Sequence, residues 1–509
     1  MKIRENKHSS VTVFEDAKDD CFDTYAKKLE ESGFAKKEEY IKADHRFAAY
    51  SRANEGVFLN YFAATREFFV TEEENCKYFS YKDVSGEEKK TVQITQLHLE
   101  DFGMSYIVRL SDGRFIIFDG GWNMEPDFDR LFECLKSGSD GGKIVIAAWI
   151  MTHPHSDHYQ CFIGFADKYE SDVRLEKVLL NFPEADDTKN FPELTYNDRR
   201  FEEDVSEIAN IPRMYERIER LGGEIFTAHT GQIYKIGDAV CEILVSLDDI
   251  IGRSQSINAS SIVIRMELCG QVILWAADTS FSETGLADKY GKYLKSDILQ
   301  VPHHGFQCGD PADEIKGYDY ICPKVCLLPV SDFNAYTAIC TYRESSRYLM
   351  NMAAVEQIIT GDKTRTINLP YMPSGNEKRE IERQYLSGLD NSGACTWVYT
   401  NLSTADYNDF CFTFLNMTGR AAKISADLFF ENPKDNIRYV KFEIPQGTFR
   451  RICVTDKDAV DDDALYFNWA SLKEKKIPKD CFFAIRFISD VPVVISHENH
   501  RESYRSINR

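Results

Sequence analysis

The sequence lacks the long apolar segments that membrane insertion and export require. No run approaches the roughly 20 apolar residues of a membrane-spanning helix. The start of the chain, MKIRENKHSSVTVFED, has no apolar core of the kind that a secretory signal carries. We therefore expect a cytoplasmic protein without a membrane partner.

Positive charge is also scarce. The 509 residues include 82 Asp and Glu against 61 Lys and Arg, which gives a formal net charge of −21, and we find no stripe of Lys or Arg. Such a field repels the phosphates of long nucleic acids, so we expect a small-molecule substrate and no long nucleic acid as partner. A bound metal ion would be a local exception that attracts anionic groups.

Paired cysteines and two catalytic motifs are missing as well. The 14 cysteines are scattered without a repeated CxxC pair, which favours reduced, packed thiols over a structural zinc site. Neither a GxSxG motif nor a glycine-rich phosphate loop is present. These absences disfavour a serine nucleophile and a flavin-dependent redox enzyme.

The patterns that are present divide the chain into four segments. Residues 1–85 combine one helical stretch with short alternating runs, which predicts a small α+β unit. Residues 86–375 alternate apolar strands with helical stretches, which predicts an α/β domain of two sheets flanked by helices. Residues 376–393 are polar and charged and are punctuated by Gly and Ser, as in a linker. Residues 394–509 hold short strands at the spacing of a separate β-sandwich.

Local patterns add detail to this division. Ser111-Asp112-Gly113, between two apolar runs, predicts a hairpin. The apolar run KIVIAAWIM predicts a strand that is buried on both faces. Residues 284–296 predict a helix, and CFFAIRFI and VPVVISH near the end of the chain predict two separate strands.

A dense set of metal-binding side chains follows directly on the buried strand. His153, His155, Asp157 and His158 lie within six residues, in the sequence THPHSDH. Neutral imidazole and carboxylate together suit zinc, iron or manganese. Because the chain turns at the carboxyl end of the strand, these side chains can converge on one point, and the spacing predicts a metal site.

THPHSDH resembles the HxHxDH motif of the metallo-β-lactamase superfamily, and the resemblance covers about residues 91–370. Further segments agree with the superfamily in order: FIIFDGG with Asp119, INASS with Asn258 and Ser261, ILWAADTS with Asp278, and QVPHHG with His303 and His304. This combination most resembles the hydrolase-like domain of competence DNA-uptake proteins. The resemblance implies an αββα sandwich.

The resemblance also implies a centre of one or two divalent metal ions, with zinc expected first and manganese or iron as alternatives. The implied ligands are His153 and His155 for one ion, Asp157 and His158 for the other, Asp278 as the bridge, and His304 as the last ligand. His304 is preferred to His303 for that position because it directly precedes Gly305, as in the HG ending of the family.

Three implied roles concern the reaction itself. Asp157 and Asp278 would position a metal-bound hydroxide, and either His303 or a metal-bound water would protonate the leaving group. His303 would otherwise contact the substrate or hold a ligand in place. Asp119 would orient a ligand imidazole through the free N–H of its ring. A turn-capping role is the alternative for Asp119.

One ligand of the family pattern is missing. Many superfamily members carry a further histidine before the strand that ends near Asp278, but here the region reads SQSINASSIVI. Asn258 would supply an oxygen ligand or a substrate contact there, or would stabilise the loop. His229, the only histidine between 158 and 303, precedes a turn well upstream, and we expect it to be structural. Occupancy by one or by two ions therefore stays open.

The last segment resembles a second family. Residues 394–505 are similar to the sensory rhodopsin transducer family of small β-sandwich proteins, most closely at Asp490–Val494 followed by His497. This resemblance implies a ligand-binding or oligomerisation module, and we expect a homo-oligomer. Nothing else in the sequence points to photosensing.

Together these patterns favour a metal-dependent hydrolase that uses a metal-bound hydroxide on a small phosphodiester or other ester. The alternative is a partly degenerate domain that binds or senses a ligand without turnover. A redox role is the third reading, which the absence of a glycine-rich phosphate loop disfavours.

Overall fold

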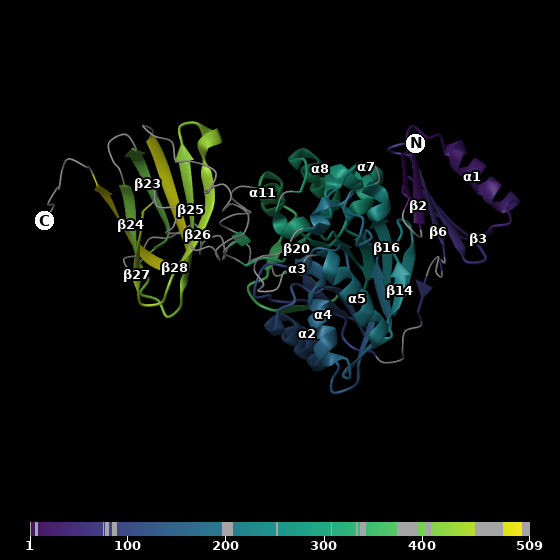
Figure 1. The fold of residues 1–509 in the computed structure, drawn as a ribbon, viewed down its shortest axis with the longest axis horizontal. Coiled ribbons are helices and arrows are strands. Elements are labelled where there is room, and N and C mark those ends of the chain that lie inside the picture. Colours follow the sequence, from purple (N-terminus) through teal and green to yellow (C-terminus); the bar gives the residue numbers. More distant parts are fainter. Residues whose placement is uncertain are drawn as a thin grey trace. The chain divides into compact units, whose positions relative to one another are not determined.

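The computed structural model describes residues 2–5, 9–74, 76, 81–83, 89–195, 207–250, 253–306, 308–331, 334–335, 343–373, 394–403, 409–453 and 482–500. These residues form two compact units, one up to residue 373 and one from residue 394 (Figure 1). The predicted segments 1–85 and 86–375 both fall within the first unit. The predicted linker, 376–393, lies outside the described residues.

The N-terminal part of the first unit is a six-stranded antiparallel sheet with the order β1-β2-β6-β5-β4-β3. Helix α1 (Asp19–Glu31) buries Phe22 and Leu29 against the apolar side chains that alternate along these strands. The strands are β1 (Lys2–Glu5), β2 (Ser9–Phe14), β3 (Ala35–Lys42), β4 (His45–Arg52), β5 (Glu55–Phe62) and β6 (Glu67–Glu74).

The next sheet has the order β14-β13-β11-β10-β9-β8-β22, with β12 beside β11. Its strands are β8 (Gln93–Gln96), β9 (Ser105–Arg109), β10 (Phe115–Asp119), β11 (Ile144–Ile150), β12 (Val173–Leu175), β13 (Lys177–Leu180), β14 (Glu224–Thr227) and β22 (Arg365–Asn368). Strands β9 and β10 form the hairpin that Ser111-Asp112-Gly113 predicts. Strand β11 is parallel to β10 and β13, so its apolar run lies inside the sheet.

A second eight-stranded sheet follows, with the order β21-β20-β19-β18-β17-β16-β15-β7. Its strands are β7 (Tyr81–Lys82), β15 (Ile233–Ile236), β16 (Ala239–Val245), β17 (Val263–Leu268), β18 (Gln271–Trp275), β19 (Ile298–Gln300), β20 (Val325–Leu328) and β21 (Gln357–Thr360). Strands β18, β19, β20 and β21 are parallel. Their carboxyl ends therefore lie at one edge of the sheet.

These two sheets pack face to face. One buried core contains side chains from both, and in it the rings of Phe118 and Trp275 stack with their centroids 4.2 Å apart. Helices α2 (Glu125–Gly138), α4 (Cys161–Tyr169) and α5 (Glu207–Leu221) pack on the outer face of the first of the two sheets. Helices α7 (Leu286–Tyr290), α8 (Pro311–Ile321) and α11 (Glu344–Asn351) lie on the opposite side (Figure 1). The predicted mixed α/β class is confirmed.

The helix predicted over 284–296 is broken into three short pieces, α6 (Phe281–Thr284), α7 and the 3-10 turn η4 (Gly291–Leu294). The breaks fall at Gly285 and Gly291, whose φ angles are +67° and +49°. A right-handed helix cannot continue through such positive φ values. None of the helices in the described ranges is long and apolar enough to span a membrane.

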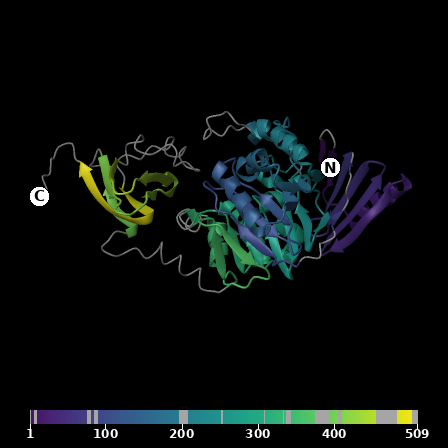
Figure 2. The ribbon, with the colours of Figure 1, turned by 90° about the horizontal axis from the view of Figure 1, so that it is seen from below.

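The second unit is rich in strands, as predicted. They are β23 (Ala394–Ser403), β24 (Asp409–Leu415), β25 (Ala422–Phe430), β26 (Ile437–Ile444), β27 (Phe449–Cys453) and β28 (Phe482–His500). The prediction of two separate strands at the end is wrong, because β28 is continuous (Figure 2). Its first half pairs with β23 and β25 and its second half with β24, and the change falls near Pro492, which cannot donate to a ladder.

Candidate metal centre

The predicted site residues lie at the carboxyl ends of neighbouring strands. Asp119 is the last residue of β10, and residues 153–158 follow β11, its parallel neighbour. Asp278 follows β18 and His304 follows β19, which are again parallel neighbours. Ligand and catalytic groups commonly gather at this edge of α/β sheets.

Three of these residues have a backbone conformation that non-glycine residues rarely adopt. The φ angles are +52° at Asp119, +48° at His303 and +53° at His304. Such strain persists only where the surrounding structure enforces it, and it is concentrated at functional sites. The strained turns aim the side chains that follow β10 and β19.

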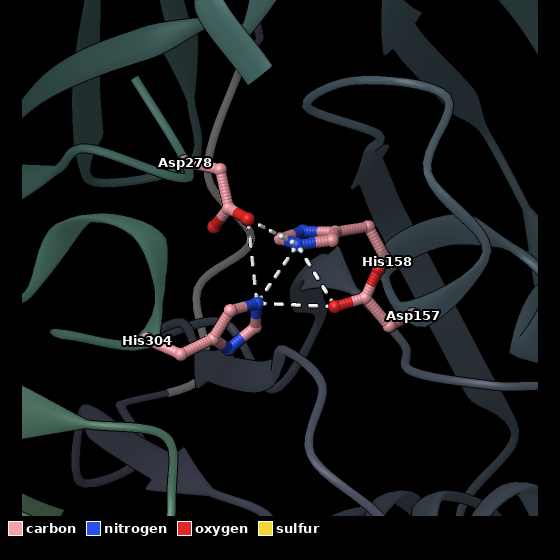
Figure 3. Close-up of side chains that lie close together, drawn as sticks. All are labelled: Asp157, His158, Asp278 and His304. Atoms are coloured by element: carbon pink, nitrogen blue, oxygen red, sulfur yellow. Dashed lines mark hydrogen bonds and ion pairs between the residues drawn. The ribbon is translucent and has the colours of Figure 1, made fainter. Parts of the chain in front are cut away.

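Four of the predicted residues converge on one point. Asp157, His158, Asp278 and His304 each offer a ligand atom within 4.8 Å of the others, all four are buried, and together they could hold a metal ion (Figure 3). Oδ2 of Asp278 lies 3.2 Å from Nε2 of His158 and 3.3 Å from Nε2 of His304. Oδ2 of Asp157 lies 3.1 Å from Nε2 of His304. We call this set the four-residue group.

The electrostatics of the four-residue group favour a cation. Burial alone would lower the pKa of His304, but Asp278 and Asp157 outweigh burial and raise this pKa to about 9. Yet Nε2 of His304 lies 3.3 Å from Nε2 of His158, where two protonated rings repel each other. Oδ1 of Asp278 and Nδ1 of His304 are buried without a hydrogen-bond partner within the described part of the chain. A divalent ion would neutralise the carboxylates instead, and the two facing Nε2 atoms would then need no protons.

Asp119 fixes the ring of His158. Nδ1 of His158 donates to Oδ2 of Asp119 over 2.8 Å, and both side chains are fully buried. The opposite nitrogen, Nε2, is thereby left for the four-residue group. A carboxylate behind a ligand imidazole is the usual arrangement at metal sites, where it sets the tautomer and the orientation of the ring.

Thr152 extends this control to His153. The backbone N–H and the hydroxyl of Thr152 donate to the two oxygens of Asp119, each over 2.8 Å. Since the hydroxyl proton points to Asp119, the hydroxyl oxygen must accept from Nδ1 of His153, which lies 3.1 Å away. One carboxylate therefore fixes His158 directly and His153 through a hydroxyl.

The Thr152 hydroxyl gives a direct test. Thr152→Val keeps the shape of the side chain but leaves Nδ1 of His153 without a partner, so we expect metal affinity to fall about tenfold. Thr152→Ser keeps the hydroxyl and should bind like the wild type. Competition with a chromophoric chelator measures the metal affinity of both variants. Equal affinity of Thr152→Val and the wild type would contradict the proposed link from Asp119 through Thr152 to His153.

His153 and His155 form a second pair beside the four-residue group. Nε2 of His153 lies 3.2 Å from Nδ1 of His155 and 4.0 Å from Oδ2 of Asp278. Burial and the nearby His158 hold the pKa of His153 well below its usual value, which keeps the ring in the neutral form that binds metals. Among the described residues, no third His, Cys, Asp or Glu ligand atom converges with this pair.

His303 and Asn258 lie at the edge of the centre. Nδ2 of Asn258 donates to Nε2 of His303 over 3.2 Å, and the same Nε2 is 4.0 Å from Oδ2 of Asp278. Burial lowers the pKa of His303, so its ring carries a single proton at neutral pH. Because Nε2 accepts from Asn258, that proton lies on Nδ1.

Two contributing residues escaped the sequence analysis. Thr152 lies within THPHSDH but is neither a ligand nor a titratable group, so no pattern marks it. Glu193 lies in the turn η1 (Pro192–Thr195), with Oε2 3.5 Å from Nε2 of His155. It is 38 residues from His155 in sequence, and a lone glutamate in a loop gives no signal.

Comparisons with known proteins add little to this picture. No protein-family model matches the chain, and no curated protein matches it. Solved structures include 18 matching chains. One is the Anabaena sensory rhodopsin transducer, with 18% identity over 21% of this chain and 88% of the other and a TM-score of 0.17. Another is Thermotoga maritima 1070, with 19% identity, 22% and 86% coverage and a TM-score of 0.16.

The first of these proteins belongs to the family that residues 394–505 resemble in sequence. At such low TM-scores, however, neither structure informs the fold or the function of this chain. The resemblance of residues 91–370 to the metallo-β-lactamase superfamily stays a prediction, because none of the comparisons supports it.

Proposed function

We propose that residues 86–375 form a metallo-β-lactamase-like αββα domain and act as a metal-dependent hydrolase on a small phosphodiester or other ester. The observation that supports this best is the buried convergence of Asp157, His158, Asp278 and His304. These four side chains would hold a divalent ion, zinc in our proposal, which would supply a hydroxide nucleophile at neutral pH and would polarise the scissile bond.

The protein side chains divide the remaining work. Asp119 and Thr152 hold the rings of His158 and His153 so that each presents Nε2 to the centre. Nδ1 of His303 carries the ring proton and is buried without a partner in the described ranges. In the proposed reaction the neutral ring of His303 contacts the substrate, and water supplies the proton for the leaving group, because an imidazole that gave up its only proton would become an imidazolate. Asn258 holds the ring in place through Nε2.

Metal dependence is the test of this proposal. Protein purified without added metal is expected to contain at least one equivalent of a divalent ion and to hydrolyse members of a panel of phosphodiesters, esters and lactones. Dipicolinate should lower the rate at least tenfold, and re-addition of the native metal should restore it. Elemental analysis with rate measurements checks each step. Bound metal without turnover of any panel member would refute hydrolysis.

The alternative is a protein that binds or senses a ligand. The observation that favours it is the absence of a third converging ligand atom at His153 and His155 within the described residues. This alternative expects one metal equivalent or less, and tight ligand binding without turnover. The same panel, used in binding and in rate measurements, separates the two proposals.

The remaining expectations are also proposals. The −21 charge favours a small substrate that reaches the metal centre without following the protein surface. We propose that the second unit binds a ligand or assembles a homo-oligomer, which light scattering on the full chain would detect. A cytoplasmic location stays a prediction from the sequence.

A further inference from the structure

Glu193 lies on the outer side of the second histidine pair. The ring of His155 turns Nδ1 toward Nε2 of His153, at 3.2 Å, and Nε2 toward Oε2 of Glu193, at 3.5 Å. Glu193 is therefore on the far side of the ring from the point where the two histidines meet. It is not a member of the four-residue group either.

This geometry selects one tautomer of His155. A ring nitrogen that binds a metal must offer its lone pair, so ligation through Nδ1 leaves the single ring proton on Nε2. That nitrogen faces the Glu193 carboxylate, which can only accept when ionised. The same carboxylate oxygen also accepts a backbone N–H, so Glu193 is placed as an acceptor toward the ring.

Glu193 is placed relative to His155 as Asp119 is placed relative to His158, but the roles of the two ring nitrogens are exchanged. Asp119 holds Nδ1 of His158 and leaves Nε2 for a metal, whereas Glu193 faces Nε2 of His155 and leaves Nδ1. In both cases a carboxylate stands behind the imidazole, on the side away from the ligand nitrogen.

Glu193 has a second contact that fixes its own position. Oε2 accepts the backbone N–H of Ile257 over 2.8 Å. Ile257 directly precedes Asn258, whose side chain holds His303. The same carboxylate thus links the loop that carries Asn258 to the ring of His155.

We infer that Glu193 is a positioning residue for a second metal ion at His153 and His155, where it partly compensates for a third ligand that the described residues do not provide. This inference rests on the proposed metal centre and not on hydrolysis. Glu193 acts through His155: it orients the ring and increases the basicity of Nδ1, and it does not touch the ion.

Cobalt(II) titration of the full-length, metal-free protein tests this inference. The wild type should bind two equivalents, followed by d–d absorption and by calorimetry. Glu193→Ala should weaken one equivalent about 10- to 100-fold and leave the other unchanged. Glu193→Gln should weaken it less, because the amide oxygen still accepts from His155 and from Ile257. Glu133→Ala, at an exposed position on α2, is the control and should behave as the wild type.

Three results would overturn the inference. They are wild-type binding of a single equivalent, unchanged binding in Glu193→Ala, and equal losses in the Ala and Gln variants, which would mark Glu193 as a direct ligand. Far-ultraviolet circular dichroism of the metal-free variants verifies that they fold. The titration needs no substrate, so an inactive protein with this binding pattern would refute the proposed hydrolysis and leave the role of Glu193 standing.

Discussion

Asp278→Asn is expected to lower kcat/KM for the best substrate of the panel about a thousandfold, equivalent to about 4 kcal/mol of transition-state stabilisation. It should also weaken metal binding at the four-residue group. Asparagine has nearly the same shape but carries no charge, so the variant isolates the contribution of the carboxylate.

The size of this effect follows from the position of one atom. Oδ2 of Asp278 lies within 3.3 Å of Nε2 of both His158 and His304, and 4.0 Å from Nε2 of both His153 and His303. No other described carboxylate oxygen approaches all four imidazoles. The backbone N–H of Asp278 donates to Oγ of Ser261, which holds the turn after β18. Loss of this charge therefore affects both proposed metal positions.

Asp112→Asn is the matched control for this variant. Asp112 is also a buried carboxylate, but it lies in the β9–β10 hairpin, at the opposite end of β10 from Asp119, and it pairs with Arg114 at 2.6 Å. We expect its metal content and its kcat/KM to equal those of the wild type. Elemental analysis and steady-state kinetics compare both variants. Wild-type values in Asp278→Asn would show that the four-residue group is not the reactive centre.

How far the sequence predicts this fold depends on the range of the interactions involved. The hairpin at Ser111-Asp112-Gly113 and the buried strand β11 follow from local patterns, and the structure has both. The breaks near 284–296 fall at Gly285 and Gly291, which the sequence shows, but helical periodicity alone does not reveal that both adopt positive φ angles. The continuity of β28 could not be predicted, because it depends on which strands pair with each half.

The same distinction applies to the candidate site. The motif THPHSDH is recognisable because four candidate ligands lie close together in sequence. The strand ends at Asp278 and His304 can be predicted because apolar runs stop there at polar residues. Thr152 and Glu193 act on imidazoles only through tertiary placement. Their residue types are common in loops and turns, so no sequence pattern distinguishes them. Positioning residues are thus harder to find from sequence than ligands.

For His229 the sequence predicted a structural role, but it did not indicate which contacts the residue makes. Its ring is buried, with Nδ1 2.8 Å from Oδ2 of Asp248 and Nε2 3.1 Å from Oε2 of Glu73. Glu73 lies on β6 of the N-terminal sheet, and Asp248 lies in the turn η2 (Leu247–Ile250) that follows β16. Phe58 of β5 stacks on the ring at 4.6 Å. A buried imidazolium therefore links the N-terminal sheet to the α/β core.

Removing this cation should destabilise the first unit strongly. In His229→Gln the buried carboxylate of Asp248 and the partly buried carboxylate of Glu73 lose their shared counter-charge. Breaking such a buried pair costs about 3–5 kcal/mol. Native-state hydrogen exchange of amides in β5 and β6 measures the loss. Amides of β25 in the second unit are the internal control and should exchange as in the wild type.

The difference between wild type and His229→Gln should also depend on pH, with a sign that the structure defines. Burial alone would lower the pKa of His229, but Asp248 and Glu73 raise it to about 10. A folded-state pKa above the unfolded value of about 6.5 adds stability that is complete below pH 6.5 and is lost as the pH rises toward 10. The difference in unfolding free energy should therefore shrink between these two values.

His45 of β4 provides the control that separates this effect from general alkaline destabilisation. It is another buried histidine, in the N-terminal sheet itself, but burial, only partly offset by its hydrogen bond to Asn60, lowers its pKa to about 4. Its contribution is lost as the pH falls below 6.5, so the difference between wild type and His45→Gln should stay constant from pH 6.5 to 10. If the two variants showed the same pH dependence over this range, His229 would not be the cation that joins the N-terminal sheet to the core.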